Sequence, residues 1–319
     1  MEIDAIALGE LLVDFTPVDD SPQGNPTYEA NPGGAPCNVL AMLSKLNKST
    51  SFIGTVGKDI HGQMLIQALK DAGIGTYHLS VCGDAETTLA FVRLSNNGER
   101  EFSFYRRPGA DTQIRPEKID KTLFDNVGLF HFGSLSMTGQ PSLIATQKAV
   151  LLAKESGCII SFDPNLRKSL WVSLEEARKQ ILWGCGECDI LKLTQEELDF
   201  VRDGKSGENA VNLMKQFKNI RLLLVTDGEK GSKAYWKTFS VSVPAFLCEK
   251  VVDTTGAGDT FMGCCLAYIL EHGLNDLSAD DVESMLRFAN AAAVLVISRK
   301  GSLRCMPDKE DIYVRQNRR

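Results

Sequence analysis

The stretch from Asp253 to Thr260 places a glycine-rich turn, a helix start and a carboxylate within eight residues. The apolar run at residues 261–270 that follows predicts a helix ending near Gly273. The first turn of such a helix offers unpaired N–H groups and a positive dipole end, which suit a phosphate or a developing oxyanion. Asp259 cannot attract an anion, so its place there indicates a base facing a hydroxyl group. A base beside an anion hole predicts phosphoryl transfer to an alcohol.

A second glycine-rich segment, Gly33-Gly34-Ala35-Pro36-Cys37-Asn38, precedes another predicted helix. Paired glycines let the backbone approach a small polar ligand closely, and Asn38 offers both a donor and an acceptor. A simple loop with a helix cap explains this segment equally well when it is taken alone. Asp14 could accept hydrogen bonds from two hydroxyls of a sugar, but solvation at the surface explains Asp14 better in isolation.

These side chains need a scaffold, and the spacing of apolar residues predicts one. Short apolar runs, each followed by polar or small residues, occur at residues 3–8, 52–56, 129–132, 159–162, 190–193 and 222–225. Segments with helical spacing or strong helix formers occur at residues 36–46, 62–72, 141–154, 174–183, 210–217 and 282–296. This alternation predicts an α/β fold with a mostly parallel sheet covered by helices, and ligands bound at the carboxyl ends of the strands.

One region interrupts the alternation of strands and helices. Residues 87–94 and 100–105 are predicted strands, and Asn97-Gly98 between them is a strong signal for a hairpin turn. Together with the extended, turn-rich chain at residues 10–31, they predict a small sheet that projects from the main body as a lid. A hairpin at the edge of the main sheet is the alternative interpretation.

Composition narrows the classes of function. The 319 residues carry a net charge of −6, which argues against a nucleic-acid partner held by bulk charge. Residues 1–12 lack the pattern of a signal peptide, and no apolar run is long enough to span a membrane. The nine cysteines and four histidines complete no zinc pattern. We therefore expect a cytoplasmic protein whose thiols are reduced and mostly belong to the core.

Taken together, the motifs resemble those of the PfkB (ribokinase-like) carbohydrate kinases. Gly33-Gly34 with Asn38 and residues 52–62 look like the first family signature, and residues 253–261 look like the second. Residues 104–111, 161–167 and 288–293 are further similar to the bacterial and plant fructokinases. The resemblance covers essentially the whole chain. It implies one domain over residues 1–319, with a ribokinase-like three-layer α/β/α fold and a β-sheet lid from residues of about 10–31 and 87–112.

The resemblance also implies an activity, which is phosphorylation of D-fructose to fructose 6-phosphate by ATP with Mg²⁺. Asp259 would accept the hydroxyl proton, and the backbone N–H groups of Gly256, Ala257 and Gly258 would form the anion hole. The implied sugar ligands are Asp14, Gly33, Gly34, Asn38, Phe104, Arg106 and Arg167. The implied ATP ligands are Lys192, Thr194, Thr226, Gly228, Gly231 and Asn290.

Cations are implied at two further places. Glu197 would act on Mg²⁺ indirectly, and Asp253 with Thr255 matches the position of a monovalent cation such as K⁺. Two residues depart from the family pattern. Thr194 stands where the family's Asn-x-x-Glu motif has its asparagine, and Asp227 stands in the nucleotide loop where leucine is more usual.

Other functions within the resemblance stay open. A ribokinase, a 2-keto-3-deoxygluconate kinase or a nucleoside kinase would share these motifs, and Arg106 with Arg167 could serve the substrate phosphate of a 1-phosphofructokinase. A non-catalytic sugar or nucleotide sensor is less consistent, because Asp259 and the glycines are present. The expected partners are a small sugar and ATP. A lid sheet with exposed edges also favours a homodimer through the lid.

Overall fold

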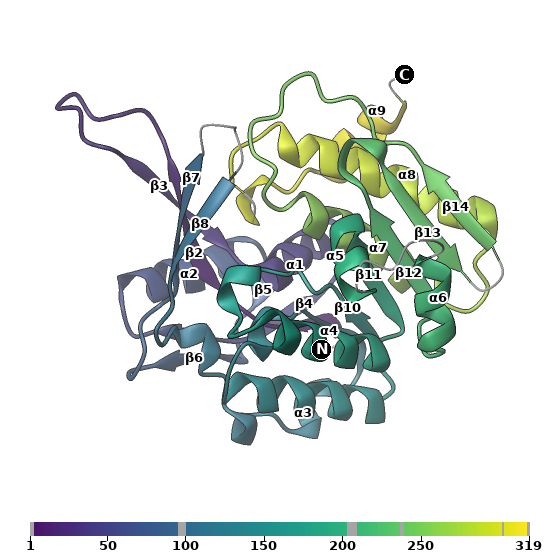
Figure 1. Ribbon diagram of the computed structural model, residues 1–319, viewed down its shortest axis with the longest axis horizontal. Coiled ribbons are helices and arrows are strands. Elements are labelled where there is room, and N and C mark those ends of the chain that lie inside the picture. Colours follow the sequence, from purple (N-terminus) through teal and green to yellow (C-terminus); the bar gives the residue numbers. More distant parts are fainter. Residues whose placement is uncertain (1–2, 95–99, 203–208, 237–238, 302, 318–319) are drawn as a thin grey trace.

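The computed structural model describes residues 3–94, 100–202, 209–236, 239–301 and 303–317 (Figure 1). Its strands are β1 Ile3–Leu8, β2 Leu12–Pro17, β3 Tyr28–Gly33, β4 Thr50–Gly57, β5 Ile74–Gly75, β6 Leu79–Cys82, β7 Leu89–Leu94, β8 Arg100–Tyr105, β9 Val127–Phe132, β10 Ile159–Phe162, β11 Ile190–Thr194, β12 Leu222–Thr226, β13 Ser232–Trp236 and β14 Phe239–Val243. Its α-helices are α1 Ala35–Lys45, α2 Ile60–Asp71, α3 Ser142–Glu155, α4 Leu174–Glu187, α5 Gln195–Val201, α6 Asn209–Gln216, α7 Ala257–His272, α8 Ala279–Ile297 and α9 Lys309–Asn317.

The main sheet is mostly parallel, as the alternation predicts. Its order is β14-β13-β12-β11-β10-β9-β1-β4-β5, with β6 paired to β4. The pairs from β12 through β5 are parallel, whereas β13 and β14 pair antiparallel at one end. Each predicted apolar run is a strand of this sheet. The strands β5, β6, β13 and β14 were not predicted. The burial of β13 and β14 alternates along each strand, so these two segments give no continuous apolar run.

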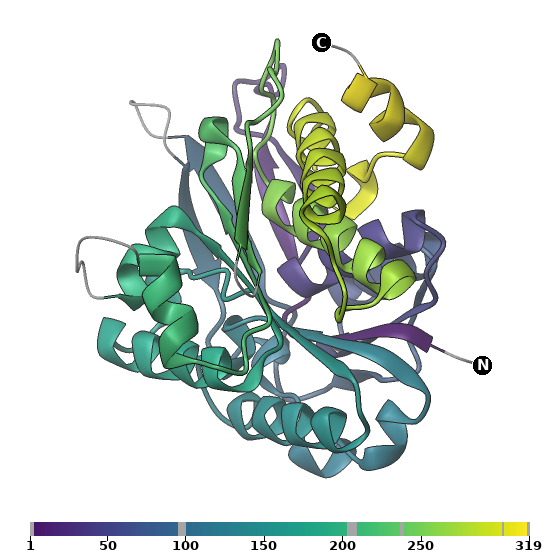
Figure 2. The same ribbon diagram turned by 90° about the vertical axis from the view of Figure 1, so that its right-hand side faces the viewer.

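Helices cover both faces of the main sheet, as Figure 2 shows in an edge view. Successive residues of a strand point to opposite faces, so Ala5 and Ala7 of β1 pack into one core and Ile6 and Leu8 into the other. The first core contains side chains from α1, α2, α7 and α8, and the second contains side chains from α3, α4, α5 and α6. The predicted three-layer α/β/α fold is therefore confirmed.

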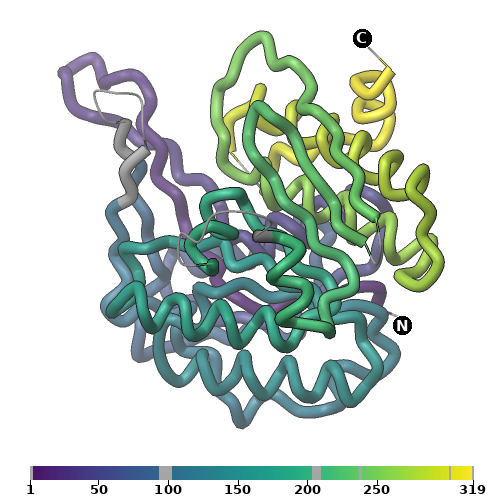
Figure 3. Tube along the Cα trace, turned by 45° about the vertical axis from the view of Figure 1, so that its right-hand side comes forward, coloured from purple at the N-terminus to yellow at the C-terminus, as the bar shows by residue number. Residues whose placement is uncertain are grey.

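A separate sheet of four strands, in the order β3-β2-β7-β8, stands beside the main sheet (Figure 3). The alternative of a hairpin at the edge of the main sheet is wrong, because β7 pairs with β2 rather than with a main-sheet strand. Within the small sheet, Asp14 pairs with Ala90 and Ala90 pairs with Phe104, so these three residues share one face. The turn predicted at residues 97–98 lies outside the described residues.

The other face of the small sheet is aromatic. Phe15 stacks on Phe91 with ring centroids 4.8 Å apart, and Tyr28 and Tyr105 meet Phe91 edge-on. Tyr28 and Tyr105 are exposed. The small sheet therefore presents a polar-and-aromatic face with Asp14 and Phe104 on one side and a partly exposed aromatic face on the other.

Composition led us to expect no membrane-spanning segment and reduced thiols. Among the described residues, no helix combines the length and the hydropathy needed to cross a membrane. All nine cysteines have free thiols, and six of these are buried.

Candidate active site

The glycine-rich turn at Gly256 opens α7 as predicted. Gly256 is the residue before the helix and has a φ of 81°, a left-handed conformation that glycine adopts without strain. Ala257, Gly258 and Asp259 form the first helical residues, so their N–H groups lie at the positive end of the helix. A Cβ atom on Gly258 would lie 2.8 Å from Nζ of Lys192, which shows that this ammonium group sits against the turn.

The two family-like motifs meet at one hydrogen bond. Asn38, in the first turn of α1, donates from Nδ2 to Oδ2 of Asp259 at 2.8 Å, although 221 positions separate the two residues. The Oδ1 atom of Asn38 is buried and has no partner among the described residues. One side of the Asn38 amide therefore orients the carboxylate, and the other side is left to accept a hydrogen bond from a ligand.

The environment of Asp259 adjusts its proton affinity. Asp259 is only 7% exposed, and burial together with the nearby charge of Asp163 raises its pKa to about 6. The hydrogen bond from Asn38 and the charges of Lys192 and Arg167 oppose this rise. The carboxylate is thus ionised at neutral pH yet basic enough to accept a proton, which suits a general base.

A buried ion pair lies beside this carboxylate. Nζ of Lys192, on β11, contacts Oδ2 of Asp163 at 2.8 Å, and both side chains are almost fully buried. Burial lowers the pKa of Lys192, but the negative charges of Asp163, Glu197 and Asp259 outweigh it and raise the pKa overall. Asp163 was not among the predicted site residues, although its position directly after β10 was an available signal.

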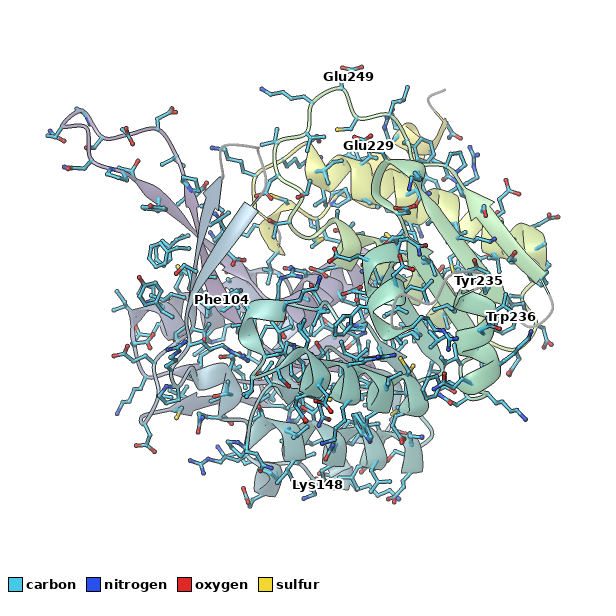
Figure 4. All side chains as sticks on the ribbon, in the orientation of Figure 1. Phe104, Lys148, Glu229, Tyr235, Trp236 and Glu249 are labelled. Atoms are coloured by element: carbon cyan, nitrogen blue, oxygen red, sulfur yellow. The ribbon has the colours of Figure 1, made fainter. Side chains whose placement is uncertain are left out.

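A cavity of about 840 Å³ brings many of the predicted residues together. The predicted residues that line it are Asp14, Gly34, Asn38, Phe104, Arg167, Lys192, Thr194, Thr255, Gly256, Gly258 and Asp259. A second cavity of about 670 Å³ shares Phe104, Arg167, Lys192 and Thr194 with the first and adds Glu197. Both are also lined by Asn165, which the sequence analysis did not single out. We call the two cavities together the cleft, and Figure 4 marks Phe104 at its small-sheet side.

Three predicted sugar ligands have contacts within the protein. Gly33 pairs with Leu12 of β2, and a Cβ atom on Gly33 would clash with Oδ2 of Asp14. A Cβ atom on Gly34 would clash with the carbonyl oxygen of Glu10. Arg106 does not line the cavities, because it donates from Nε and Nη2 to Oδ2 of Asp111 at 2.8 and 2.6 Å. Its role as a sugar ligand stays a prediction.

Thr194 and Glu197 form a capping box at the start of α5. The Thr194 hydroxyl accepts from the N–H of Glu197, and Oε2 of Glu197 accepts from the N–H of Thr194 at 2.8 Å. Oε1 of Glu197 accepts from the N–H of Leu166 at 2.8 Å. The Thr-x-x-Glu spacing was a signal for this helix start, which the sequence analysis did not use. Any contact of Glu197 with Mg²⁺ would therefore be indirect.

The predicted nucleotide loop follows β12 and adjoins the cleft, because Thr226 is the register partner of Thr194. Gly231 has a φ of 98°, and a Cβ atom there would clash with the backbone of residues 243–245. Asn290 donates to the carbonyl oxygens of Val243 and Pro244 and accepts from the Ser232 hydroxyl. These contacts hold α8 against β13 and the end of β14. Thr226, Gly228, Gly231 and Asn290 do not line the two cavities.

The predicted cation position contains a buried carboxylate. Oδ1 of Asp253 accepts from the N–H of Thr255 at 2.8 Å, and Oδ2 accepts from the N–H of Gly301 at 3.4 Å. Hard cations prefer oxygen ligands, so the Asp253 carboxylate fits a cation at this position. The described residues contain no group of three or more His, Cys, Asp or Glu side chains that could hold a metal ion.

Comparisons with known proteins show the family of the chain. The model of the family described as "pfkB family carbohydrate kinase" matches residues 3–309. The chain is 39% identical over 304 residues to a probable fructokinase-3 of Arabidopsis thaliana, covering 95% of this chain and 88% of that protein. A fructokinase of Xylella fastidiosa with bound ATP superposes with a TM-score of 0.88 at 31% identity, covering 98% and 97% of the two chains. A fructokinase double mutant of Vibrio cholerae O395 with fructose, ADP and potassium ion bound gives a TM-score of 0.88 at 29% identity, covering 99% of each chain.

Proposed function

The chain belongs to the pfkB family of carbohydrate kinases, and from this premise we propose that it transfers the γ-phosphoryl group of ATP to the 6-hydroxyl of D-fructose. It is an ATP-dependent sugar kinase with fructokinase relatives along nearly its whole length. One observation carries the proposed mechanism. A buried Asp259, held by Asn38, lies at the N-terminus of α7 and faces the cleft.

Asp259 acts as the base in this proposal. The 6-hydroxyl oxygen attacks the γ-phosphorus while its proton passes to the Asp259 carboxylate. The new bond joins the sugar oxygen to phosphorus, and the bond between phosphorus and the β–γ bridging oxygen breaks. The products are fructose 6-phosphate and ADP, and the proton then leaves Asp259 for solvent. The pKa of about 6 supports this role, because the carboxylate is available at neutral pH and can release its proton again.

Positive groups beside Asp259 would stabilise the charge on the transferred group. The N–H groups of Gly256, Ala257 and Gly258 lie at the positive end of α7. The Lys192 ammonium lies against Gly258, and its raised pKa keeps it charged. We propose that Lys192 interacts with the transferred phosphoryl group as well as with Asp163. The family resemblance by itself implied only a contact between Lys192 and ATP.

The sugar would lie between the small sheet and α1. Asp14 and Phe104 share the face of the small sheet that lines the cleft, and Asn38 and Arg167 line it from the main body. Asp14 would accept hydrogen bonds from sugar hydroxyls, and the ring of Phe104 would cover the apolar surface of the sugar. Arg167 adds positive charge where sugar and phosphate meet.

Cations complete the proposed reaction. Glu197 would act indirectly on a Mg²⁺ ion bound with the nucleotide, and such an ion would offset the negative charge of the phosphates. K⁺ would be held by Asp253 and the backbone of Thr255, next to the anion hole. The nucleotide itself would lie along Thr194, Thr226 and the loop of Gly228 and Gly231, with Asn290 near the adenine.

We further propose that residues 1–319 form one domain whose small sheet acts as a lid, made of residues of about 10–31 and 87–112. Closure over the sugar would exclude water and limit hydrolysis of ATP.

The aromatic face around Phe91 fits a homodimer through the lid, because burial of exposed aromatic rings favours association. A light-scattering mass that stays monomeric at every concentration would contradict the dimer. The free thiols fit a reducing compartment, and we propose the cytoplasm.

The decisive experiment is a coupled ADP-release assay with ATP and five acceptors. These are fructose, ribose, 2-keto-3-deoxygluconate, fructose 1-phosphate and adenosine. We expect the highest kcat/KM with fructose. A higher value for another acceptor would assign the chain to that kinase activity instead, and ligand binding without turnover on any acceptor would indicate a sensor.

A further inference from the structure

The first turn of α1 carries Asn38 but lacks a cap from its own segment. The residue before the helix is Gly34, which has no side chain, and the first turn contains no acidic residue. Pro36 has no N–H to offer. The helices α2, α4 and α8 are capped locally, by Asp59, Ser173 and Ser278, whereas α3 and α7, like α1, have no side-chain cap from the residue before them. The N-terminus of α1 therefore depends on a group from elsewhere in the chain.

Glu10 supplies that group from the link between β1 and β2. Its Oε1 atom accepts from the N–H of Ala35, the first residue of α1, at 2.8 Å. Glu10 is only 3% exposed, and its Oε2 atom is buried without a partner among the described residues. Gly34 packs closely against the backbone of Glu10, because any Cβ atom at position 34 would clash with the Glu10 carbonyl oxygen. Its φ of 134° is also one that other residues rarely adopt.

The contact between Glu10 and Ala35 is connected to Asp259 through the first turn of α1. Ala35 and Asn38 belong to the same helical turn, so a shift of that turn would move the Nδ2 atom that holds Asp259. Cys37, between them, has its thiol pKa raised by burial and then by the charges of Glu10 and Asp259. This thiol thus lies within electrostatic reach of both carboxyl groups. Glu10 also lines the cleft.

We propose that Glu10 is a positioning residue for phosphoryl transfer, which fixes the first turn of α1 and, through Asn38, the orientation of Asp259. The inference rests on the proposed function of Asp259 as the base. Burial raises the pKa of Glu10 to about 7, and the backbone hydrogen bonds of Glu10 and Ala35 oppose this rise. The charge of Asp111 adds to the rise, and that of Arg106 opposes it. A protonated Oε2 would leave Oε1 as the acceptor for Ala35, an arrangement that glutamine can reproduce.

The test compares three substitutions of Glu10 with a matched loss of a cap elsewhere. Glu10→Ala removes the acceptor, Glu10→Asp draws it back from Ala35, and Glu10→Gln keeps an oxygen there. Ser173→Ala is the control, because Ser173 caps α4, a helix without predicted site residues. We expect Glu10→Ala to lower kcat by roughly 10- to 100-fold, as misplacement of a catalytic group does. Glu10→Asp should act in the same direction, and Glu10→Gln should restore most of kcat.

A pH profile separates positioning from plain stability. The hydrogen bond from Asn38 lowers the pKa of Asp259, so its loss should move the acid limb of kcat/KM to higher pH. We expect this movement in Glu10→Ala and Glu10→Asp but not in Ser173→Ala. In an Asn38→Ala background, Glu10→Ala should have little further effect on kcat.

The proposal is overturned if Glu10→Ala or Glu10→Asp lowers only the melting temperature and leaves the acid limb in place. It is also overturned if Glu10→Gln raises the KM for fructose as much as Glu10→Ala does, since Glu10 would then be a direct sugar ligand. Infrared titration of the carboxyl band that disappears in Asp259→Asn needs no turnover. This titration reports whether Glu10→Ala changes the pKa of Asp259, even if the wild-type protein phosphorylates none of the acceptors.

Discussion

On the sugar side of the cleft, the polar side chains hold one another and still face the ligand space. Asn38 orients Asp259 and keeps one amide oxygen unpaired. Lys192, which was predicted as an ATP ligand, lies close to Asp259 and is charged and buried against Asp163. On the nucleotide side, the corresponding side chains are engaged within the protein. Glu197 closes a capping box with Thr194 and also binds the backbone of Leu166, and Asn290 fastens α8 to β13 and the chain after β14.

The difference teaches that the two halves of the cleft would recognise their ligands differently. Preorganised charges on the sugar side are suited to act on the transition state, where they are already desolvated and oriented. The nucleotide side offers backbone groups and loop shape, with its side chains serving the loops that present them. Substitutions on the sugar side should therefore affect turnover, and those on the nucleotide side should affect stability and the KM for ATP.

The largest expected effect is that of Asp259→Asn. The amide keeps the shape of the carboxylate but cannot accept the hydroxyl proton, so kcat should fall by about 10²–10⁴-fold. Thermal unfolding and fructose binding by calorimetry should stay close to those of the wild type. Full activity in this variant would show that Asp259 is not the base. The sugar side of the cleft would then not be the side that controls turnover.

Lys192→Met should have the next largest effect. Loss of the ammonium should lower kcat by about 10²–10³-fold, as removal of a group that stabilises transition-state charge does. It would also leave Asp163 buried without its cation, at a cost of about 3–5 kcal/mol in the free energy of unfolding. Asp163→Asn combined with Lys192→Met should recover stability in denaturant titrations but not kcat. Recovery of both would mean that Lys192 has only a structural role.

A pH profile sharpens the same point. Because Asp259 must be ionised, kcat/KM should fall by about tenfold for each pH unit below its pKa of about 6. The ordinary value is 3.8, so between pH 3.8 and about 6 the folded state binds a proton that the unfolded state has lost. The resulting stabilisation is complete below pH 3.8 and is lost as the pH rises through about 6. An acid limb near the ordinary value would show that burial does not tune this base.

The smallest expected effects are at Thr194. Thr194→Ala loses the N-cap of α5, which should cost about 0.5–2 kcal/mol and raise the KM for ATP, whereas Thr194→Asn keeps an acceptor at the cap. We expect kcat at saturating ATP to change less in both variants than in any sugar-side variant. A large loss of kcat in Thr194→Asn would show that the nucleotide side also controls turnover. The proposed difference between the two sides of the cleft would then be wrong.

The sequence predicted much of the fold because its signals are local. Continuous apolar runs marked the central strands, and Gly256 marked the start of α7. Asn38 and Asp259 were expected in one site only because their motifs resemble the two signatures of the PfkB family, since neither follows a parallel strand of the main sheet. The helix at Thr194 was missed although its capping signal was present.

Other features depend on tertiary contacts that no local pattern shows. The pairing of Lys192 with Asp163 joins the ends of two neighbouring strands, and the hydrogen bond from the Ala35 N–H to Glu10 joins α1 to the link between β1 and β2. The sequence indicated that Arg106 was cationic, but not that Asp111 binds it. Such partners are chosen by packing, so they appear only once the chain is folded.

The hydrogen bond between Asn38 and Asp259 also constrains how the enzyme can be made. Because its two ends lie 221 positions apart, the base cannot be oriented until α7 has been synthesised and packed against α1. Contacts of such long sequence separation form slowly, and domains of this size commonly fold through intermediates. During translation, the growing chain would therefore carry its sugar-facing residues well before it could consume ATP.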